Sequence, residues 1–119
     1  MHNFKELIVW QKARLLVKDL YIIVKGFPED EKYGIISQIK RSSVSIPSNI
    51  AEGSGRNTGN DFCRFLDIAT GSSYELETLI ILSFDLDFLG ETEYYNFISQ
   101  IEEIQKMIYS LRTRISNNS

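Results

Sequence analysis

The chain has 119 residues, 43% of them hydrophobic, and a formal net charge of −3, which predicts one domain over residues 1–119 with a single substantial core. Its one cysteine excludes an internal disulfide framework, and its one histidine excludes both the Glu-x-x-His pairs of ferritin-type metal bundles and histidine-dependent catalytic sites. No apolar run approaches the roughly 20 residues of a membrane-spanning helix, and the first residues lack a signal-peptide pattern, so we expect a cytoplasmic protein without metal, cofactor or membrane partner.

The first helix is predicted to run from Lys5 or Leu7 to Lys25. Its apolar positions repeat at spacings of 3 and 4, as in a coiled-coil seam: Trp10, Ala13, Val17, Leu20 and Val24. Gly26 then supplies a residue that can adopt a left-handed cap. Because acidic side chains suit the positive end of a helix dipole, we expect residues 29–31 in the first turn of the second helix.

The second helix is predicted to continue through Pro47 to the glycines of Gly53-Ser-Gly55. Proline removes a backbone donor and its ring presses on the preceding turn, so we expect one helix with a kink. The apolar seam keeps its register on both sides of the proline: Ile36, Ile39, Ser43, Ile46 and Ile50. Serines at positions 42, 43 and 45 make this seam thin, so a partner helix can approach closely.

The third helix is predicted to run from Thr58, which can cap it together with Asp61, to Leu89. Its buried side is expected to hold apolar and small residues: Phe62, Phe65, Leu66, Ala69, Ser72, Leu76, Leu79, Ser83, Leu86 and Leu89. We expect the small residues at 69–73 to pack against the serines of the second helix. Close packing would then offset the cost of Gly71 inside a helix, about 1 kcal/mol relative to alanine.

The fourth helix is predicted to begin at Glu91, after Gly90, with acidic residues in its first turn. Its seam is the most regular in the chain: Phe97, Ile101, Ile104, Ile108, Leu111 and Ile115. No strand-like alternation appears between the helical segments. The sequence therefore predicts an all-α, up-down-up-down antiparallel four-helix bundle whose second helix is kinked by proline.

Apolar and aromatic residues exceed what one bundle core uses. Several are expected off the seams or at their margins: Ile8, Val9, Leu15, Ile22, Ile23, Ile80, Ile81, Phe84, Phe88, Tyr94, Tyr95 and Tyr109. Because monomers seldom leave broad apolar patches in water, the sequence predicts a homo-oligomer.

No catalytic constellation is present, so we predict that the protein is not an enzyme. Cys63 lies beside Arg64 near a helix start, features that lower the pKa of a thiol. A packed side chain is nevertheless the favoured interpretation of this cysteine.

Positive charge is concentrated in the first half of the chain. Residues 1–60 carry nine Lys/Arg and six Asp/Glu, whereas residues 61–119 carry four and ten. Five basic residues are candidates for nucleic-acid binding: Arg14, Lys18, Lys25, Arg41 and Arg56. A cluster of this kind can neutralise phosphates, although solvent-facing helix charges explain the same pattern. For Arg41, Asn49 and Glu52 we favour a structural polar cluster, within one chain or between subunits.

Several sequence blocks follow one another along the chain: Val9-Trp10-Gln11-x-Ala13, Phe27-Pro28, Gln38-x-x-Arg41, Ser45-Ile46-Pro47-x-Asn49-Ile50-Ala51-Glu52-Gly53, Arg64-Phe65-Leu66-x-Ile68-Ala69-x-Gly71-Ser72 and Glu75-Leu76. Together they cover nearly the whole chain, which resembles the four-helix-bundle proteins encoded in intervening sequences of bacterial 23S ribosomal RNA genes. That family is similar to the accessory variability determinant of diversity-generating retroelements, a pentameric barrel that binds nucleic acid and the reverse transcriptase. The resemblance implies a homopentamer and no established activity.

We therefore expect a noncatalytic, homo-oligomeric scaffold or adaptor that binds structured RNA or other nucleic acid through the basic residues of its first two helices. The alternative is a protein–protein interaction module without nucleic-acid binding. Such a module would dock an unidentified protein through an exposed apolar or acidic face of the third and fourth helices.

Overall fold

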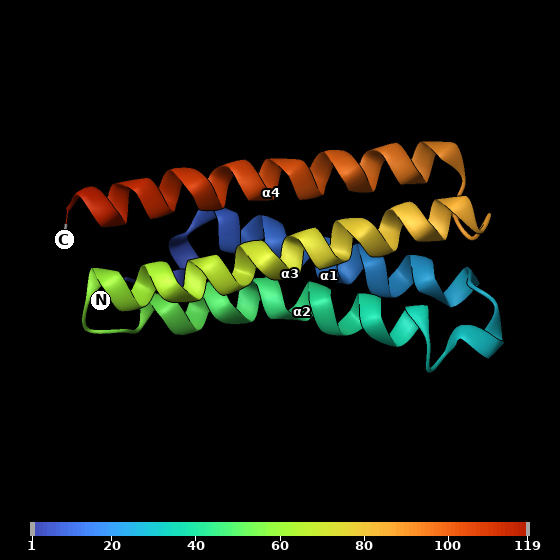
Figure 1. Ribbon diagram of the computed structural model, residues 1–119, viewed down its shortest axis with the longest axis horizontal. Coiled ribbons are helices and arrows are strands. Elements are labelled where there is room, and N and C mark those ends of the chain that lie inside the picture. Colours follow the sequence, from blue (N-terminus) through green and yellow to red (C-terminus); the bar gives the residue numbers. More distant parts are fainter. Residues whose placement is uncertain (1, 119) are drawn as a thin grey trace.

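The computed structural model describes residues 2–118, which form four long helices joined by short turns. The helices are α1 (Ile8–Ile23), α2 (Ile35–Ser54), α3 (Gly59–Asp85) and α4 (Glu91–Asn117), and short 3-10 turns occupy Phe4–Glu6, Val24–Gly26 and Glu29–Glu31. Each helix runs antiparallel to the preceding one, along the 46 Å axis of the molecule (Figure 1). The predicted up-down-up-down bundle is confirmed, and no strand occurs in the described residues.

The turn between α1 and α2 differs from the prediction. The acidic residues 29–31 form their own 3-10 turn and α2 begins four residues later, at Ile35. The Glu31 carboxylate still contacts the start of α2, because it accepts a hydrogen bond of 3.3 Å from the Ile35 amide. Gly26 closes the 3-10 turn that follows α1 and does not adopt the left-handed conformation expected of it.

The core of α1 is centred one residue away from the predicted seam. Val9 and Leu16 are buried with the expected Ala13, Leu20 and Val24, whereas Trp10 and Val17 are only half-buried. Val9 was expected at the margin, and so was Ile80 of α3, which is fully buried. Both expectations were wrong because neighbouring apolar residues on a helix define two overlapping stripes. Which stripe faces the core depends on where the other helices lie.

The helix α2 passes through Pro47 without a break, as predicted. The contact between α2 and α3 is the most extensive between any two helices of the bundle. At mid-height the Ser45 and Ser72 hydroxyls share a hydrogen bond of 2.7 Å, and the Asn49 side-chain amide donates to Ser45 Oγ at 3.0 Å. The two thin seams therefore meet, as the sequence predicted.

A glycine brings the same two helices together at the end of α2. A methyl group on Gly53 would lie 2.7 Å from Cβ of Phe65 and 3.0 Å from Cδ1 of Phe62. The expectation that close packing explains Gly71 was wrong, because Gly71 is exposed and a methyl group there would meet nothing within 4 Å. The small serine side chains and Gly53 therefore allow α2 and α3 to approach closely.

Helix α3 ends at Asp85, four residues before the predicted end. Asp87 adopts a left-handed conformation with φ of 63°, which stops the helix. The amide of Phe88 then donates to the carbonyl of Ser83 at 2.8 Å, and the amide of Asp87 donates to that of Phe84 at 3.0 Å. These two bonds satisfy carbonyls that the helix end leaves free, so an aspartate takes the place that glycine usually fills.

Helix α4 buries all six residues of its predicted seam. Polar contacts tie its outer faces to the neighbouring helices. Lys12 of α1 pairs with Glu103 at 3.0 Å, and Arg112 donates two hydrogen bonds to Asp67 of α3, at 2.6 and 3.1 Å. The hydrogen bonds and charge of Asp67 raise the pKa of Arg112, because both favour the charged guanidinium.

Candidate nucleic-acid interface

The face formed by α1 and α2 carries two neighbouring hollows. The tryptophan groove, of about 390 Å³, is lined by Phe4, Trp10, Arg14, Val17, Val44, Pro47, Ser48 and Ala51. The tyrosine groove, of about 520 Å³, is lined by Tyr21, Lys32, Tyr33, Ile36, Ser37, Lys40, Arg41 and Val44. Because Val44 lines both, the two grooves follow one another along α2. We refer to this surface as the α1–α2 face.

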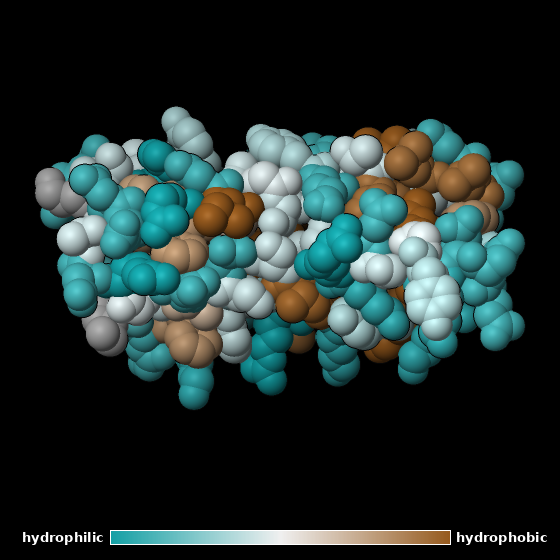
Figure 2. All heavy atoms as spheres, turned by 60° about the horizontal axis from the view of Figure 1, so that its bottom comes forward, coloured by the Kyte–Doolittle hydropathy of each residue, from teal (hydrophilic) through white to brown (hydrophobic). Residues whose placement is uncertain are grey.

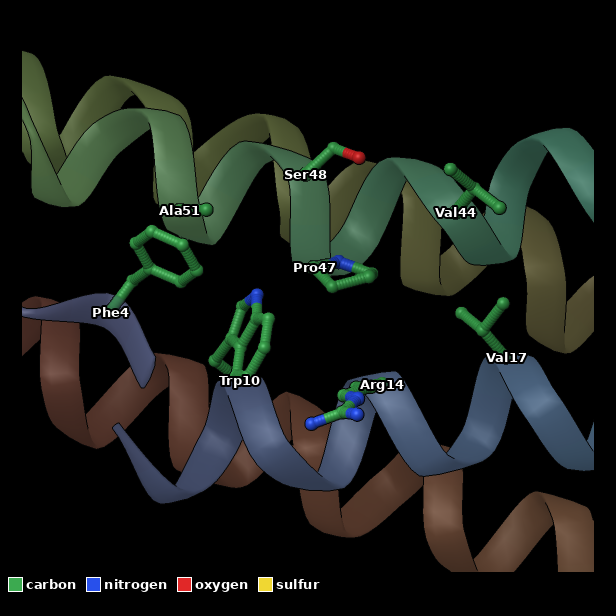
Figure 3. Close-up of a pocket in the computed structure, with 8 residues that line it drawn as sticks. All are labelled: Phe4, Trp10, Arg14, Val17, Val44, Pro47, Ser48 and Ala51. Carbon is green, nitrogen blue, oxygen red and sulfur yellow. The ribbon is translucent and has the colours of Figure 1, made fainter. Parts of the chain in front are cut away.

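The tryptophan groove follows from the register of α1. Because Trp10 lies one position off the buried seam, its ring points toward α2 at Pro47 and Ala51 (Figure 3). The Phe4 and Trp10 rings pack in a T-shaped arrangement with centroids 5.0 Å apart, and the Arg14 guanidinium lies 5.7 Å from the Trp10 ring. Such a cation–π contact holds the guanidinium at the rim of the groove.

The tyrosine groove combines aromatic rings with cations. Lys40 Nζ lies 4.9 Å from the Tyr21 ring centroid, and Lys32 Nζ lies 5.5 Å from that of Tyr33. Arg41 is the third cation on its wall. No carboxylate lines the groove, and residues 32–51 contain no Asp or Glu. This part of the surface therefore favours anions.

Two of the five predicted phosphate-binding residues line these grooves, Arg14 in the tryptophan groove and Arg41 in the tyrosine groove. Lys18 is exposed on α1, four residues after Arg14, and Lys25 is exposed in the 3-10 turn Val24–Gly26, four residues after Tyr21. Lys18, Lys25 and Arg41 form no ion pair with any described residue. Their charges are therefore not neutralised within the chain.

The fifth candidate, Arg56, lies beyond the far end of α2, close to the turn into α3. It pairs with Glu52 at 3.3 Å and lies 4.6 Å from the Phe65 ring. The structure thus separates Arg56 from the other four candidates and gives it partners within the chain.

Among the described residues, no hydrogen bond or ion pair joins the three members of the predicted polar cluster. Asn49 donates to the carbonyl of Ser45 at 2.8 Å, and Glu52 pairs with Arg56. Arg41 has no hydrogen bond or ion pair among the described residues. Asn49 and Glu52 stabilise α2 locally, and Arg41 is available to a partner.

Sequence reasoning missed two residues of the tyrosine groove, Lys32 and Tyr33. Both lie in the turn before α2, where no helical periodicity marks a face. The available signal was composition, because Lys-Tyr-Gly places an aromatic residue and a cation beside a residue that interrupts helices.

Other sites considered from the sequence have simple structural explanations. Cys63 is buried and its Sγ lies 3.7 Å from the carbonyl oxygen of Arg112, which confirms the packed side chain. Within residues 2–118, no three His, Cys, Asp or Glu side chains gather in a way that suits a metal ion. None of the described helices is long and apolar enough to span a membrane.

Comparisons with known proteins are consistent with this architecture. The model of the 23S rRNA-intervening sequence protein family matches residues 5–110. A crystal structure of a protein with unknown function, from the S23 ribosomal protein family of Bacteroides thetaiotaomicron, superposes with a TM-score of 0.82. The superposition covers 89% of this chain and 96% of that chain at 24% identity, which shows a shared fold. No curated protein matches the chain.

Proposed function

The chain belongs to the 23S rRNA-intervening sequence protein family, and from its surface we propose that it is a noncatalytic, self-associating helical adaptor that binds RNA through the α1–α2 face. The family match confirms the resemblance seen in the sequence blocks. The RNA-binding half of the proposal rests on one observation: Arg41 on this face, and Lys18 and Lys25 four residues after the groove residues Arg14 and Tyr21, are exposed without an ion-pair partner among the described residues.

The distribution of acidic residues supports the same surface. Residues 61–119, a range that contains most of α3 and all of α4, carry ten Asp/Glu and four Lys/Arg, so the negative charge of the chain lies mainly there. Three of those acids are paired: Asp61 with Arg64, Asp67 with Arg112 and Glu103 with Lys12. An acidic net charge therefore still leaves one cationic face, and local potential governs the approach of a polyanion.

The proposal predicts a measurable salt dependence. Neutralising about three phosphates gives a slope of roughly −2 to −3 for the logarithm of affinity against the logarithm of salt concentration. The test is to titrate a fluorescent RNA hairpin with the wild-type protein at several salt concentrations and to measure binding by fluorescence anisotropy. Reversing Lys18 and Lys25 to glutamate should lower the affinity and reduce the magnitude of the slope by about 2.

A matched control uses the opposite half of the molecule. Lys106 and Arg114 are exposed on α4, and reversing both to glutamate changes the net charge by the same amount. This control should bind RNA nearly as tightly as the wild type. Equal losses in the two variants, or the absence of salt-sensitive binding near physiological ionic strength, would contradict the RNA-binding half of the proposal.

Self-association is supported by exposed hydrophobic residues. Ile8, Leu15 and Ile22 are exposed on α1 at intervals of seven residues, which places them on one side of the helix. A second group lies on α3 and at its end, formed by Ile81, Leu82 and Leu86. Figure 2 shows hydrophobic surface concentrated toward the end of the molecule where α3 turns into α4. Surfaces of this kind commonly pack against other subunits.

We propose that the assembly is a homopentamer, the state that the sequence resemblance implies. Light scattering after size-exclusion chromatography should then give five times the 13.7 kDa mass of the chain. Replacing Leu15 and Ile22 with aspartate should reduce this mass. A monomer at concentrations of tens of micromolar would rule out the proposed assembly.

The exposed group at the end of α3 also favours a second candidate function, the docking of a different protein. In that case replacing Ile81 and Leu86 with aspartate would abolish capture of the partner without altering the assembly. Capture that persists after nuclease treatment, together with no RNA binding by the purified protein, would favour this candidate.

A further inference from the structure

The side chain of Tyr33 is the most exposed large hydrophobic group in the described chain, at 88%. The turn that carries it is nonetheless held firmly. The amide of Gly34 donates to the carbonyl of Glu31 at 3.0 Å, and the Glu31 carboxylate receives the Ile35 amide at 3.3 Å. A hydrogen-bonded turn thus presents an exposed aromatic ring at the tyrosine groove, where water meets most of its apolar surface.

The groove offers a second ring and three cations around one hollow. Tyr21 lies on the α1 side with Lys40 Nζ 4.9 Å from its ring, and Lys32 Nζ is 5.5 Å from the Tyr33 ring. Arg41 completes the set. The ammonium groups therefore lie within reach of any planar group stacked on either ring and of the charged groups attached to it.

Size and lining also suit one nucleotide. The volume of about 520 Å³ lies within the range of small-ligand sites, roughly 300–1,000 Å³. Ile36 and Val44 form apolar parts of the wall, and the Ser37 hydroxyl makes no hydrogen bond with the described residues. It is therefore available to a base edge or a ribose hydroxyl.

The nearest acidic residues do not occupy the groove. Glu29, Asp30 and Glu31 precede the turn, but none of them lines the hollow. The Glu31 carboxylate is directed to the start of α2, where it accepts the Ile35 amide. A phosphate in the groove therefore meets three cations and no carboxylate on the walls.

We propose that the tyrosine groove binds an unpaired nucleotide of RNA, with its base stacked on Tyr33 and its phosphates on Lys32, Lys40 and Arg41. This inference rests on the proposed RNA binding and deepens it by naming the class of RNA. Bases inside a duplex are stacked on one another and cannot lie on a protein ring, so single strands, loops and bulges are the preferred ligands.

The charge density of the ligand separates this inference from purely electrostatic binding. A duplex carries more phosphates per unit length than a single strand. A cationic face without stacking would therefore prefer the duplex, whereas the tyrosine groove would prefer the single strand. Tighter binding of the single strand than of the duplex would therefore indicate base stacking.

The test compares two probes of equal length by fluorescence anisotropy. One is a 20-nucleotide strand of A and C only, which cannot pair with itself, and the other is its duplex with the complementary strand. The wild-type protein should bind the single strand more tightly. Tyr33→Ala should weaken binding to the single strand by about 5- to 150-fold, the effect of losing one stacked base, and leave duplex binding nearly unchanged.

Two further variants make the result specific. Tyr33→Phe keeps the ring and should retain the wild-type preference. Tyr109→Ala removes another tyrosine that is 73% exposed, on α4, and should change neither affinity. Because both native side chains are largely exposed, circular dichroism should show the same helix content in all variants.

The outcomes distinguish the inference from the function on which it rests. If reversing Lys18 and Lys25 abolishes binding while Tyr33→Ala has no effect, RNA binding stands and the nucleotide site is refuted. The same conclusion follows if the wild-type protein prefers the duplex. If neither probe binds in a salt-dependent manner, both proposals fail.

Discussion

Two glycines of this bundle should respond in opposite directions to the same substitution. Gly53 is buried where α2 meets α3, and Gly71 is exposed in the middle of α3. Replacing each with alanine adds one methyl group in a helix. Both variants gain the same helix propensity. The difference between their free energies of unfolding therefore measures the cost of the methyl group at the close contact between α2 and α3.

The expected magnitudes follow from the surroundings of each methyl group. At position 71 nothing lies within 4 Å, so Gly71→Ala should stabilise the protein by about 0.5–1 kcal/mol. At position 53 the methyl group would lie 2.7 Å from Phe65 Cβ and 3.3 Å from the backbone carbonyl oxygen of Phe62. Neither atom can move without shifting α3, so overpacking should cost about 1–3 kcal/mol and exceed the gain in propensity.

Urea unfolding followed by circular dichroism at a fixed protein concentration measures both effects. A change of 1 kcal/mol moves the midpoint by about 0.3–1 M, because the slope is typically about 1–3 kcal/mol per molar urea. Gly71→Ala should raise the midpoint and Gly53→Ala should lower it. If Gly53→Ala raised the midpoint as much as Gly71→Ala, the close contact between α2 and Phe65 would be refuted.

The remaining predictions concern the core, the serine contact and a helix cap. Ile80→Ala should cost about 2–5 kcal/mol in thermal or urea unfolding, whereas Ile81→Ala, at a site 38% exposed, should cost about 1 kcal/mol or less; similar losses would contradict the core register. A double-mutant cycle of Ser45→Ala and Ser72→Ala should give a coupling of about 0.5–1.5 kcal/mol, and zero coupling would mean that the 2.7 Å hydrogen bond adds no stability. Thr58→Ala removes the side chain that accepts the amide at position 61 and should cost about 0.5–2 kcal/mol, measured by the same unfolding assay.

The fold was largely predictable because each helix carries a regular apolar seam. The α4 seam was identified in full. The apolar seam of α2 keeps its register across Pro47, and this continuity correctly predicted a single helix. The register of α1 was not predictable, since Val9 and Trp10 are both apolar and only the packing of the other helices decides between them. The end of α3 was missed because Asp87 adopts a left-handed conformation that is usual for glycine.

The candidate interface was only partly predictable. Helical spacing predicted Arg14, Lys18 and Lys25 along one side of the first helix, and all three are exposed, but Lys25 lies in the 3-10 turn that follows α1. It also grouped Arg56 with Arg41, but α2 ends before Arg56, which then pairs with Glu52. Tyr33 lies in a turn, where spacing carries no information about direction, so its role in the groove emerged only from the structure.

The most direct test of RNA binding by the α1–α2 face is to locate the contact on the protein. A 20-nucleotide strand carrying 4-thiouridine can be crosslinked to the wild-type protein by ultraviolet light, and the modified peptides identified by mass spectrometry. We predict crosslinks within residues 10–44, with Tyr33 among the modified positions. Crosslinks concentrated in residues 59–117 would contradict RNA binding by the α1–α2 face. So would a crosslinking yield no higher than that of the variant in which Lys18 and Lys25 are reversed to glutamate.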